Sequence, residues 1–439
     1  MTVADDRRSG TADAVVIGAG VIGCSVGLEL ARRGHRVVVV DKGPAAGAGS
    51  TSSSSAVVRF NYSTLDSVKL AWESAQLWRR WADHLGVADE AGLARMIPSG
   101  MLVLDSPSTR LDFVRGHFDA VGIPYEELDP TELSRRFPGL DRGRYFPPKR
   151  VSDEAFWADA GGELGGYLCP DAGFVDDPAL AAHNLMVAAQ HHGATFLFRS
   201  EVVHVERGGG RVSGVVLDSG EQWSAPVVVN VAGPHSSHVN QLAGLPTTGI
   251  RTRPLRQEVD VVPCPDDFTL EAGGMMVADT DLGTYFRPHP GGSLVVGGTE
   301  PECDELEWVG DADVFDDRPT AEIWERQTTR VARRLPNLGV PGRPTGLAAL
   351  YDVSDDWVPI YDRTDLAGFY VAIGTSGNQF KNAPMVGLLM AELIEACEAG
   401  HDHDADPITV TGPVTGNVID LGHFSRRRTV HRTSNSVLG

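Results

Sequence analysis

The feature that most constrains the fold is a glycine-rich turn between two apolar segments, in the stretch DAVVIGAGVIGCSVGLELARRGHRVVVVDK at residues 13–42. Residues 14–17 and 37–40 are apolar and mostly β-branched, which is typical of buried strands. Between them, apolar side chains recur every three or four residues, and Gly34 stands where a helix needs a C-terminal cap. The stretch therefore predicts a strand, a helix with one buried face and a second strand, which together form a βαβ unit.

The turn itself has the pattern GxGxxG, at residues 18–23. Gly18 makes the tight turn, Gly20 lets a pyrophosphate approach the backbone at the helix N-terminus, and Gly23 permits close packing of the helix on the strand. Asp41 follows Gly23 by eighteen residues, at the end of the second strand, where a carboxylate accepts hydrogen bonds from a ribose. The motif predicts dinucleotide binding. Because NAD and FAD share it, other residues must decide between them.

Composition limits the kind of protein and the kind of partner. With 439 residues, of which 42% are apolar and 50 are glycine, the chain fits one large α/β enzyme or two domains. A net charge of −21 argues against nucleic acid, which needs a basic surface, so we expect a small-molecule partner. The five cysteines lack CxxC spacing, which predicts no disulfide framework or zinc site and a reducing, cytoplasmic compartment. Glycines interrupt the long apolar run at 14–31, so no membrane span or signal peptide is expected.

Two later segments repeat the pattern of a strand followed by a glycine-containing turn. After a hairpin turned at 208–210, residues 226–231 predict a strand that ends in Ala232-Gly233-Pro234. Near the C-terminus, GFYVAIGTSGNQFKNAPMVGLLMAELIEACEAG predicts a strand, a glycine-rich turn and a helix with Pro384 in its first turn. The return of such distant segments to one sheet is similar to a disulfide-reductase-like or amine-oxidase-like FAD domain, more than to a simple dehydrogenase.

Six segments, in this order, carry a family resemblance: VVIGAGVIGCSVGLELARRGHRVVVVDK, GSTSSSSAVVRFNY, GYLCPDAGFVDDPALAAHNLMVAAQHHGATF, VVNVAGPHSSHVNQLAG, GLAALYDVSDDWVPIY and GTSGNQFKNAPMVG. Together they resemble the D-amino-acid oxidase superfamily of FAD-dependent amine oxidoreductases, most closely its branch of sarcosine, dimethylglycine and glycine oxidases. The resemblance covers most of the chain. It implies an α/β fold with a Rossmann-like FAD-binding domain and a smaller α+β substrate domain whose sheet is mainly antiparallel. FAD is expected in an extended conformation, with its isoalloxazine ring at the domain interface.

Both domains are expected to be discontinuous. The FAD-binding domain takes residues 13–95, 165–250 and 335–400. The substrate domain takes residues 96–164 and 251–334, with a sheet that carries RPLRQEVDVV and TYFRPHPGGSLVVGG.

The flanking and polar segments are expected to be solvated. Residues 1–12 are expected to form a disordered N-terminus, and residues 401–439 a C-terminal tail that is mobile in its last part, SRRRTVHRTSNSVLG. The run HDHDAD at 401–406 is interpreted as a solvated loop rather than a metal site, and the acidic run at 302–317 as an exposed insertion.

The residues expected to bind FAD are those at positions that match the family. They are Gly18, Gly20, Val21, Ile22, Gly23, Asp41, Lys42, Ser50, Thr51, Val202, Ala232, Gly233, Gly374, Gly377 and Asn378. In the family the stretch matching 49–51 wraps the pyrophosphate and flavin, where small hydroxyl side chains and exposed backbone N–H groups suit a close approach. Non-covalent FAD is expected. The cysteine that some relatives bond to the flavin would fall within ALYD, which has none, and residues 47–56 contain no histidine.

An amino acid that a flavin oxidises must hold its α-hydrogen near flavin N5, and its carboxylate is the natural handle for that orientation. In the sarcosine oxidase relatives an arginine in an R-x-x-Y setting and a lysine in the C-terminal glycine-rich turn hold this carboxylate. Arg59 in RFNY and Lys381 in GTSGNQFK match these positions. Tyr351 stands near the position of the arginine that grips the carboxylate in glycine and D-amino-acid oxidases, which favours a secondary amine over a primary D-amino acid. Tyr285 and Arg287 either face the substrate or are sheet residues of the substrate domain.

The resemblance implies that a neutral secondary amine of an amino acid passes a hydride to flavin N5, giving an imine that hydrolyses, while O2 is reduced to H2O2. The candidate catalytic residues are Arg59, Lys381, Tyr285 and Tyr351. Two alternatives stay open. Val295 stands where monomeric sarcosine oxidases carry a lysine that promotes reaction with oxygen, which favours a dehydrogenase of the same substrates, or of a 2-hydroxy acid, with another electron acceptor. The other is a flavoprotein subunit of a larger complex, and the oligomeric state is left open.

Overall fold

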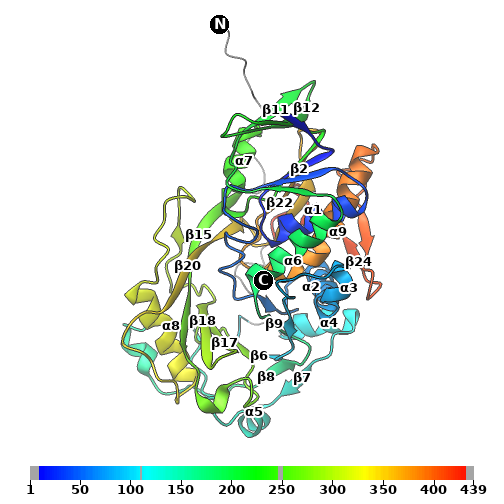
Figure 1. Cartoon of the computed structure of the whole chain (residues 1–439). Helices are drawn as coiled ribbons and strands as arrows, with labels where there is room; N and C mark the ends of the chain where they lie inside the picture. Colours follow the sequence, from blue (N-terminus) through cyan, green and yellow to red (C-terminus); the bar gives the residue numbers. More distant parts are fainter. Residues whose placement is uncertain (1–8, 109–110, 246–250, 432–439) are drawn as a thin grey trace.

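A computed structural model describes residues 9–108, 111–245 and 251–431 of the chain. Its first sheet has six strands in the order β10-β3-β2-β14-β22-β21 (Figure 1). Neighbouring strands run parallel, except that β21 runs antiparallel to β22. The strands are β10 (Thr195–Leu197), β3 (Val37–Val40), β2 (Ala14–Ile17), β14 (Val227–Asn230), β22 (Phe369–Ile373) and β21 (Ile360–Arg363). Because β2, β3 and β22 are apolar along their whole length, both faces of this sheet must be covered.

Helices cover one face of the parallel sheet, where α1 (Val21–Arg32) packs against α6 (Pro178–His191) and α9 (Ala383–Glu398). Val16 and Val39 lie in the core on that face, whereas Val15 and Val38 lie in the core on the other. That other face is covered by a four-stranded sheet of β1 (Ser9–Thr11), β13 (Gln222–Ser224), β12 (Arg211–Leu217) and β11 (Val202–Gly208). The predicted βαβ unit, the hairpin and the strand before Ala232 are all confirmed.

The second large sheet has nine strands. Along its main path they are β19 (Glu307–Trp308), β15 (Thr252–Pro263), β18 (Ser293–Gly298), β17 (Thr284–His289), β16 (Met276–Asp279), β6 (Met101–Leu104), β8 (Gly166–Cys169) and β7 (Glu126–Leu128), and β20 (Gly346–Ser354) pairs with β15. Only the pair β16–β6 is parallel among these described strands. The prediction of a mainly antiparallel second sheet beside a Rossmann-like one is confirmed.

Successive residues of the nine-stranded sheet point to two different cores. Leu102 and Val277 lie in the core formed with α8 (Ala321–Arg334). Their neighbours Met101 and Met276 lie instead in the core that contains α1 and α9. The sheet therefore packs one face on its own helix and the other against the helical side of the parallel sheet, because side chains alternate across a strand.

The remaining elements are short. A three-stranded sheet contains β4 (Val57–Val58), β9 (Gly173–Val175) and β5 (Met96–Ile97). The other helices are α2 (Leu65–Arg79), α3 (Trp81–Leu85), α4 (Leu111–Val121), α5 (Pro130–Arg136) and α7 (Ser236–Leu242), with 3₁₀ turns η1 (Glu154–Trp157), η2 (Gly233–His235), η3 (Asp266–Phe268) and η4 (Phe380–Asn382). In the described parts of the chain, no helix combines the length and apolar character needed to cross a membrane.

The structure differs from the expected domain ranges at two strands. β8 pairs with β6. β20 pairs with β15, with Gly346 opposite Asp260 at one end and Ser354 opposite Thr252 at the other. Both strands therefore belong to the nine-stranded sheet. The expected ranges 165–250 and 335–400 put them in the FAD-binding domain. A strand's own alternation of side chains does not say which sheet it joins, because pairing partners are chosen by residues far away in the sequence.

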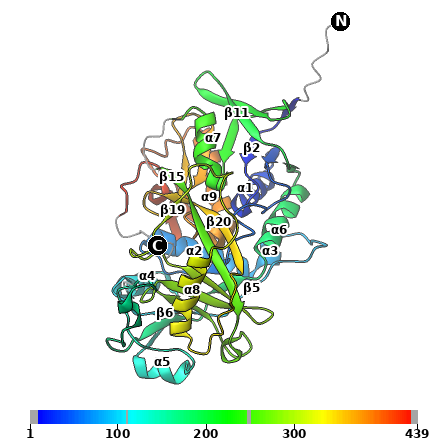
Figure 2. The ribbon, with the colours of Figure 1, turned by 90° about the vertical axis from the view of Figure 1, so that its left-hand side faces the viewer.

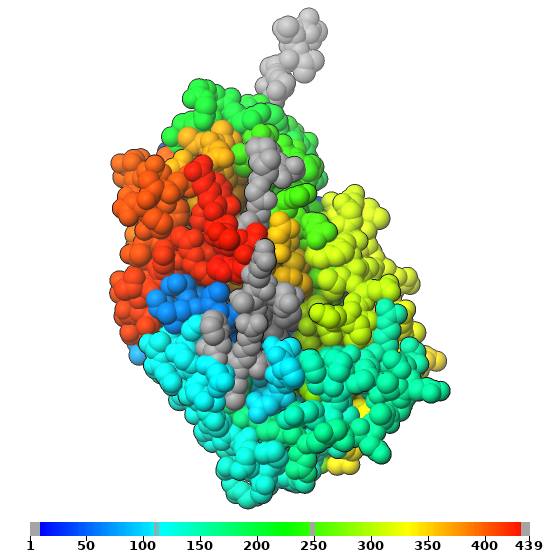
Figure 3. Space-filling view, turned by 180° about the vertical axis from the view of Figure 1, so that it is seen from behind, coloured from blue at the N-terminus to red at the C-terminus, as the bar shows by residue number. Residues whose placement is uncertain are grey.

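Both ends of the described chain are more ordered than expected. At the N-terminus, Ser9–Thr11 pairs with β13, and residues 1–8 lie outside the described residues. At the C-terminus, β23 (Thr409–Thr411) pairs with β24 (Val418–Asp420), and η5 (Leu421–Phe424) buries Leu421 and Phe424. His403, expected in a solvated loop, is only 1% exposed. Figure 3 shows the red C-terminal segment packed against the orange one before it.

Aspartates from earlier segments of the chain hold residues 425–431 in place. Arg426 pairs with Asp362 at 3.0 Å and with Asp404 at 2.8 Å. Arg428 pairs with the fully buried Asp356 at 2.7 Å. The mobile tail predicted from SRRRTVHRTSNSVLG is therefore wrong as far as residue 431, and the rest of it lies outside the described residues.

We expect Arg428→Met to lower the free energy of unfolding by about 3 kcal/mol, because it leaves the Asp356 carboxylate buried without its partner. Arg427→Met is the matched control: Arg427 is 59% exposed, its partner Asp365 is 66% exposed and its other partner Asp404 lies at 3.5 Å and keeps Arg426, so a much smaller change is expected. Chemical denaturation of both variants measures the difference. Equal stability of the two would contradict the anchoring role of Arg428.

Candidate active site

The turn from β2 into α1 lies at the edge of the parallel sheet where the carboxyl ends of β2, β3 and β14 meet. Gly18 has a φ of 112°, and a Cβ atom there would lie 2.4 Å from the carbonyl oxygen of Val231. A Cβ atom on Gly23 would lie 1.9 Å from the carbonyl oxygen of Gly18. Both positions require glycine, because a side chain would collide with backbone. The turn thus leaves the backbone open to a close ligand.

The N-terminus of α1 faces the same edge. Gly20 precedes the helix and supplies no side-chain cap. The Val21 N–H donates to Thr51 Oγ1 at 3.1 Å, which brings the serine-rich stretch next to the turn. Ile22 is buried in the first turn of the helix. A helix N-terminus concentrates backbone N–H groups and the positive end of the helix dipole, so this position suits a pyrophosphate group.

Asp41 ends β3, and its carboxylate is fixed by backbone. Its two oxygens accept hydrogen bonds from the N–H groups of Ala19 and Gly43, each at 2.6 Å. A carboxylate keeps further lone pairs for ribose hydroxyls. Lys42, also predicted at the cofactor, donates to Asp313 at 2.5 Å. Lys42 therefore has a carboxylate partner that the sequence did not indicate.

Three other segments carry predicted cofactor residues. Ser200, two residues before the buried Val202, donates from its N–H to the carbonyl oxygen of Asp41 at 3.0 Å. A Cβ atom on Gly18 would lie 3.2 Å from Cα of Ala232, and Gly233 follows with a φ of 55°. Ser50, in contrast, donates from Oγ to the carbonyl oxygen of Leu350 in β20, at 2.7 Å, and so ties the serine-rich stretch to the nine-stranded sheet.

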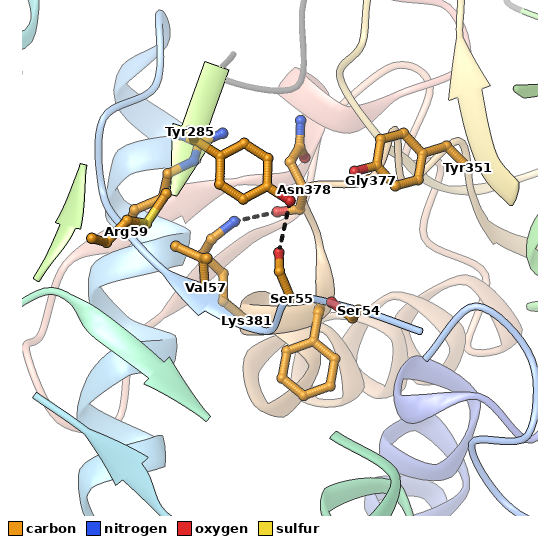
Figure 4. A pocket seen from close by; sticks show the side chains of 11 residues that line it. Ser54, Ser55, Val57, Arg59, Tyr285, Tyr351, Gly377, Asn378 and Lys381 are labelled. Carbon is orange, nitrogen blue, oxygen red and sulfur yellow. Dashed lines mark hydrogen bonds between the residues drawn. The ribbon is translucent and has the colours of Figure 1, made fainter. Parts of the chain in front are cut away.

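A cavity of about 430 Å³, counted with its open mouth, lies between the two large sheets (Figure 4). It brings together all four predicted catalytic residues, Arg59, Lys381, Tyr285 and Tyr351. Its other lining residues are Ser54, Ser55, Val57, Met276, Gly377, Asn378 and Phe380. Its lining of cations, phenols and hydroxyl groups suits a small polar ligand.

Both cations of the cavity are 3% exposed. Arg59 donates to the carbonyl oxygen of Asn61 at 2.5 Å, and burial lowers its pKa. Lys381 donates to the carbonyl oxygen of Asn378 at 2.5 Å, and among the described residues no carboxylate forms an ion pair with it. Burial, assisted by the charge of Arg59, lowers the pKa of Lys381 well below its usual value. The cavity wall therefore holds two like charges close together, and each of them disfavours the charged form of the other.

Tyr62 connects these two cations, although it is absent from the predicted site residues. The guanidinium carbon of Arg59 lies 4.6 Å from the centre of the Tyr62 ring, and Lys381 Nζ lies 5.2 Å from it. Lys381 also donates to the Tyr62 hydroxyl at 2.8 Å, and this hydroxyl donates to the carbonyl oxygen of Asn378 at 2.8 Å. The ring and hydroxyl fix the spacing of the charges. The signal for Tyr62 was its place in RFNY, three residues after Arg59.

Two further tyrosines come from the nine-stranded sheet. Tyr285 of β17 donates from its hydroxyl to Ser55 Oγ at 3.2 Å (Figure 4). Tyr351 of β20 packs so closely on the glycine-rich turn that a Cβ atom on Gly377 would lie 2.2 Å from its ring. Burial raises the pKa of both phenols, that of Tyr351 well above its usual value. Both side chains are therefore protonated hydrogen-bonding groups rather than bases at neutral pH.

A buried carboxylate, that of Asp352, holds the glycine-rich turn after β22 in place. The N–H of Gly374, whose φ is 66°, donates to Asp352 at 2.6 Å. Burial raises the pKa of Asp352 to about 7. Gly377 has a φ of 69°, and Asn378 presents its carbonyl oxygen to Tyr62 and Lys381. Asp352 thus supports the glycine-rich turn. It follows Tyr351 directly in the sequence, and no sequence motif indicated this role.

Arg287, whose role the sequence left open, is not among the cavity-lining residues. Its Nε donates to the carbonyl oxygen of Ser55 at 3.0 Å, and its guanidinium lies 4.0 Å from the centre of the Phe174 ring. Burial lowers its pKa to about 10. Val295 pairs with Arg287 across β17 and β18 and is buried. Arg287 thus supports the serine-rich stretch through Ser55, without lining the cavity.

A sequence model of the family described as "DAO: FAD dependent oxidoreductase" matches residues 13–393. The chain belongs to this family. It is 28% identical to FAD-dependent oxidoreductase domain-containing protein 1 of Xenopus laevis over 418 residues, covering 87% of this chain and 79% of that one. It is 26% identical to the glycine oxidase of Geobacillus kaustophilus (strain HTA426), covering 89% of this chain and 94% of that one. The crystal structure of L-proline dehydrogenase from P. horikoshii shares its fold with a TM-score of 0.74, at 21% identity, over 95% of this chain and 97% of that one.

FAD is the cofactor of the DAO family, and the described residues fit it. The turn at Gly18 admits a ligand close to backbone, the N-terminus of α1 suits the pyrophosphate, and the Asp41 carboxylate suits the ribose. Bound by these residues, FAD would supply the redox chemistry of an oxidoreductase. Within the residues that the structure describes, no cluster of three or more His, Cys, Asp or Glu side chains suits a metal ion.

We expect Gly18→Ala to lower the FAD content of the purified protein on the order of tenfold or more, because the added methyl group forces strained backbone at the pyrophosphate turn. Gly208→Ala is the control, since a Cβ atom at Gly208 meets nothing within 4 Å. The ratio of flavin to protein absorbance measures the effect. Full flavin content in Gly18→Ala would contradict the assignment of this turn.

Proposed function

We propose that the protein oxidises the C–N bond of a secondary, N-substituted amino acid, and that Arg59 and Lys381 hold the carboxylate of that substrate. One observation carries the proposal. Two cations from opposite ends of the chain are buried in one cavity wall, against the same tyrosine ring. A substrate carboxylate carries the opposite charge and accepts hydrogen bonds from an arginine and a lysine.

The surrounding groups support orientation rather than proton removal. Tyr285 and Tyr351 are protonated phenols that donate or accept hydrogen bonds. No side-chain base is needed if the substrate amine enters in its neutral form, so Arg59 and Lys381 chiefly orient the carbon that loses its hydride. The imine product hydrolyses in water to a carbonyl compound and a smaller amine.

Two observations support the choice of substrate. The related glycine oxidase carries the name of an amino acid substrate, in keeping with a carboxylate handle. The resemblance puts Tyr351 where glycine and D-amino-acid oxidases carry a carboxylate-binding arginine, and Tyr351 packs on Gly377 at the cavity. The cations that line the cavity, Arg59 and Lys381, match the carboxylate-binding positions of the sarcosine oxidase branch, which favours N-substituted amino acids as substrates.

We propose O2 as the electron acceptor, with H2O2 as its product. A dehydrogenase with another acceptor is the second candidate, and Val295 is the observation that favours it, because an apolar side chain stands where sarcosine oxidases carry a lysine. One experiment separates the two. After anaerobic reduction by substrate, rapid return of the flavin colour in air, with peroxide, supports the oxidase, and slow return supports the dehydrogenase.

Anaerobic bleaching of the flavin by sarcosine and other N-substituted glycines tests the carboxylate clamp. We expect Arg59→Met and Lys381→Met each to weaken substrate binding about 100-fold, because each removes one partner of a buried charge pair. Both variants are expected to fold, since each removes a buried charge, and flavin content checks this. Lys69→Met, which replaces a lysine paired with Asp66 outside the cavity, is the control.

Sarcosine methyl ester sharpens this test, because it lacks the carboxylate. The ester is expected to bind poorly to the wild-type protein and no worse to the two variants. If wild-type flavin is bleached by no carboxylated amine, or if the ester and the acid respond alike to the substitutions, the proposal fails.

The lowered pKa of Lys381 predicts a pH dependence of carboxylate binding. Only the charged amine attracts a carboxylate, and it is present below the pKa of Lys381 in the free protein. The Kd of acetate, an unreactive carboxylate, is therefore expected to be constant below that pKa and to rise about tenfold per pH unit above it. Shifts of the flavin absorption spectrum measure this Kd. Lys381→Met should remove the dependence, and an unchanged profile would rule out Lys381 as the titrating group.

A further inference from the structure

The acidic insertion between β18 and α8 is fixed to the nine-stranded sheet near both of its ends. β19, within the insertion, pairs with β15, and Figure 2 shows the two strands side by side below α7. Arg256 of β15, whose side chain is 1% exposed, donates to the carbonyl oxygens of Asp316 and Arg318, each at 2.7 Å. Arg256 also pairs with Glu307 at 3.0 Å. The residues between Trp308 and Asp316 therefore form a loop whose two ends are anchored.

The tip of this loop reaches the parallel-sheet domain through one carboxylate. Asp313 Oδ1 accepts from Lys42 Nζ at 2.5 Å and from His235 Nε2 at 2.9 Å. Because a carboxylate only accepts, His235 carries its proton on Nε2 in this contact. The hydrogen bond from Lys42, the largest cause, lowers the pKa of Asp313.

The two partners of Asp313 stand on opposite sides of the nucleotide-binding turn. Lys42 follows the end of β3, and His235 lies in η2, just after β14. In the parallel sheet, β3 and β14 are the two neighbours of β2, whose carboxyl end leads into the turn at Gly18. Asp313 thus joins the ends of the strands that flank β2. In open α/β sheets a dinucleotide lies in the crevice outside these strand ends.

We propose that Asp313 retains FAD by bridging Lys42 and His235 across the nucleotide crevice. A ligand that lies along this edge must pass the bridge when it leaves. The bridge also neutralises Asp313, whose negative charge would otherwise disfavour a pyrophosphate nearby. The three side chains are partly exposed, at 35% for Lys42, 57% for Asp313 and 27% for His235, so the bridge opens at modest cost and acts on the rate of release.

The rate of FAD release from the holoenzyme tests the proposal, followed by flavin fluorescence after dilution. We expect Asp313→Asn to release FAD about three- to tenfold faster, as the loss of the partly exposed ion pair with Lys42 and of the hydrogen bond from His235 predicts. Asp317→Asn is the matched control: it makes the same charge change in the same insertion and is expected to release FAD at the wild-type rate. Added salt should speed release from the wild type toward the rate of Asp313→Asn and affect that variant less.

A double substitution distinguishes the bridge from a general effect of charge. Lys42→Met combined with Asp313→Asn is expected to release FAD no faster than the faster of the two single variants, because both remove the same contact. Wild-type release by Asp313→Asn, equal acceleration by Asp317→Asn, or fully additive effects of Lys42→Met and Asp313→Asn would each overturn the proposal. Thermal unfolding of the flavin-free variants checks that they fold. The readout needs no substrate, so it is independent of the proposed oxidation.

Discussion

The contact between one face of the nine-stranded sheet and the helical side of the parallel sheet is the interaction on which the rest of the molecule depends. Met101 and Met276 on that face share a core with α1 and α9, whereas Leu102 and Val277 pack on α8. A one-residue slip in either strand would turn the wrong set of side chains to this junction. The cavity lies along the same junction, so the apolar packing that holds the two sheets together also fixes the distances between residues of the site.

Burial of two like charges is the main energetic demand of the cavity. Arg59 and Lys381 share the Tyr62 ring, and Arg59 donates to the carbonyl oxygen of Asn61 whereas Lys381 donates to that of Asn378. For Lys381 the neutral partners replace only part of the lost hydration, as its lowered pKa indicates. The fold therefore holds ready, before any ligand arrives, a cationic wall that a small anion relieves.

This cationic wall contrasts with a chain whose net charge is −21. Any anion that approaches the protein meets overall repulsion at a distance, and the buried cations attract it only near the cavity. Part of the acidic excess is used within the fold itself. Asp356 and Asp362 bind the C-terminal arginines, and Asp313 reaches across to Lys42 and His235. The acidic insertion is thus a structural link between the two large sheets as well as an exposed surface.

The sequence by itself determined the local structures and the chemical nature of the site. The turn at Gly18, the helix after it and the alternating strands follow from backbone geometry and side-chain periodicity, which neighbouring residues settle. Arg59 and Lys381 were predictable because short motifs around them match a family. Only the tertiary structure decided that both charges meet at Tyr62, that β20 joins the nine-stranded sheet, and that Lys42 has Asp313 as its partner. These contacts join segments that lie far apart in the sequence, and no local pattern encodes which distant surfaces fit together, because packing of the whole core makes that choice.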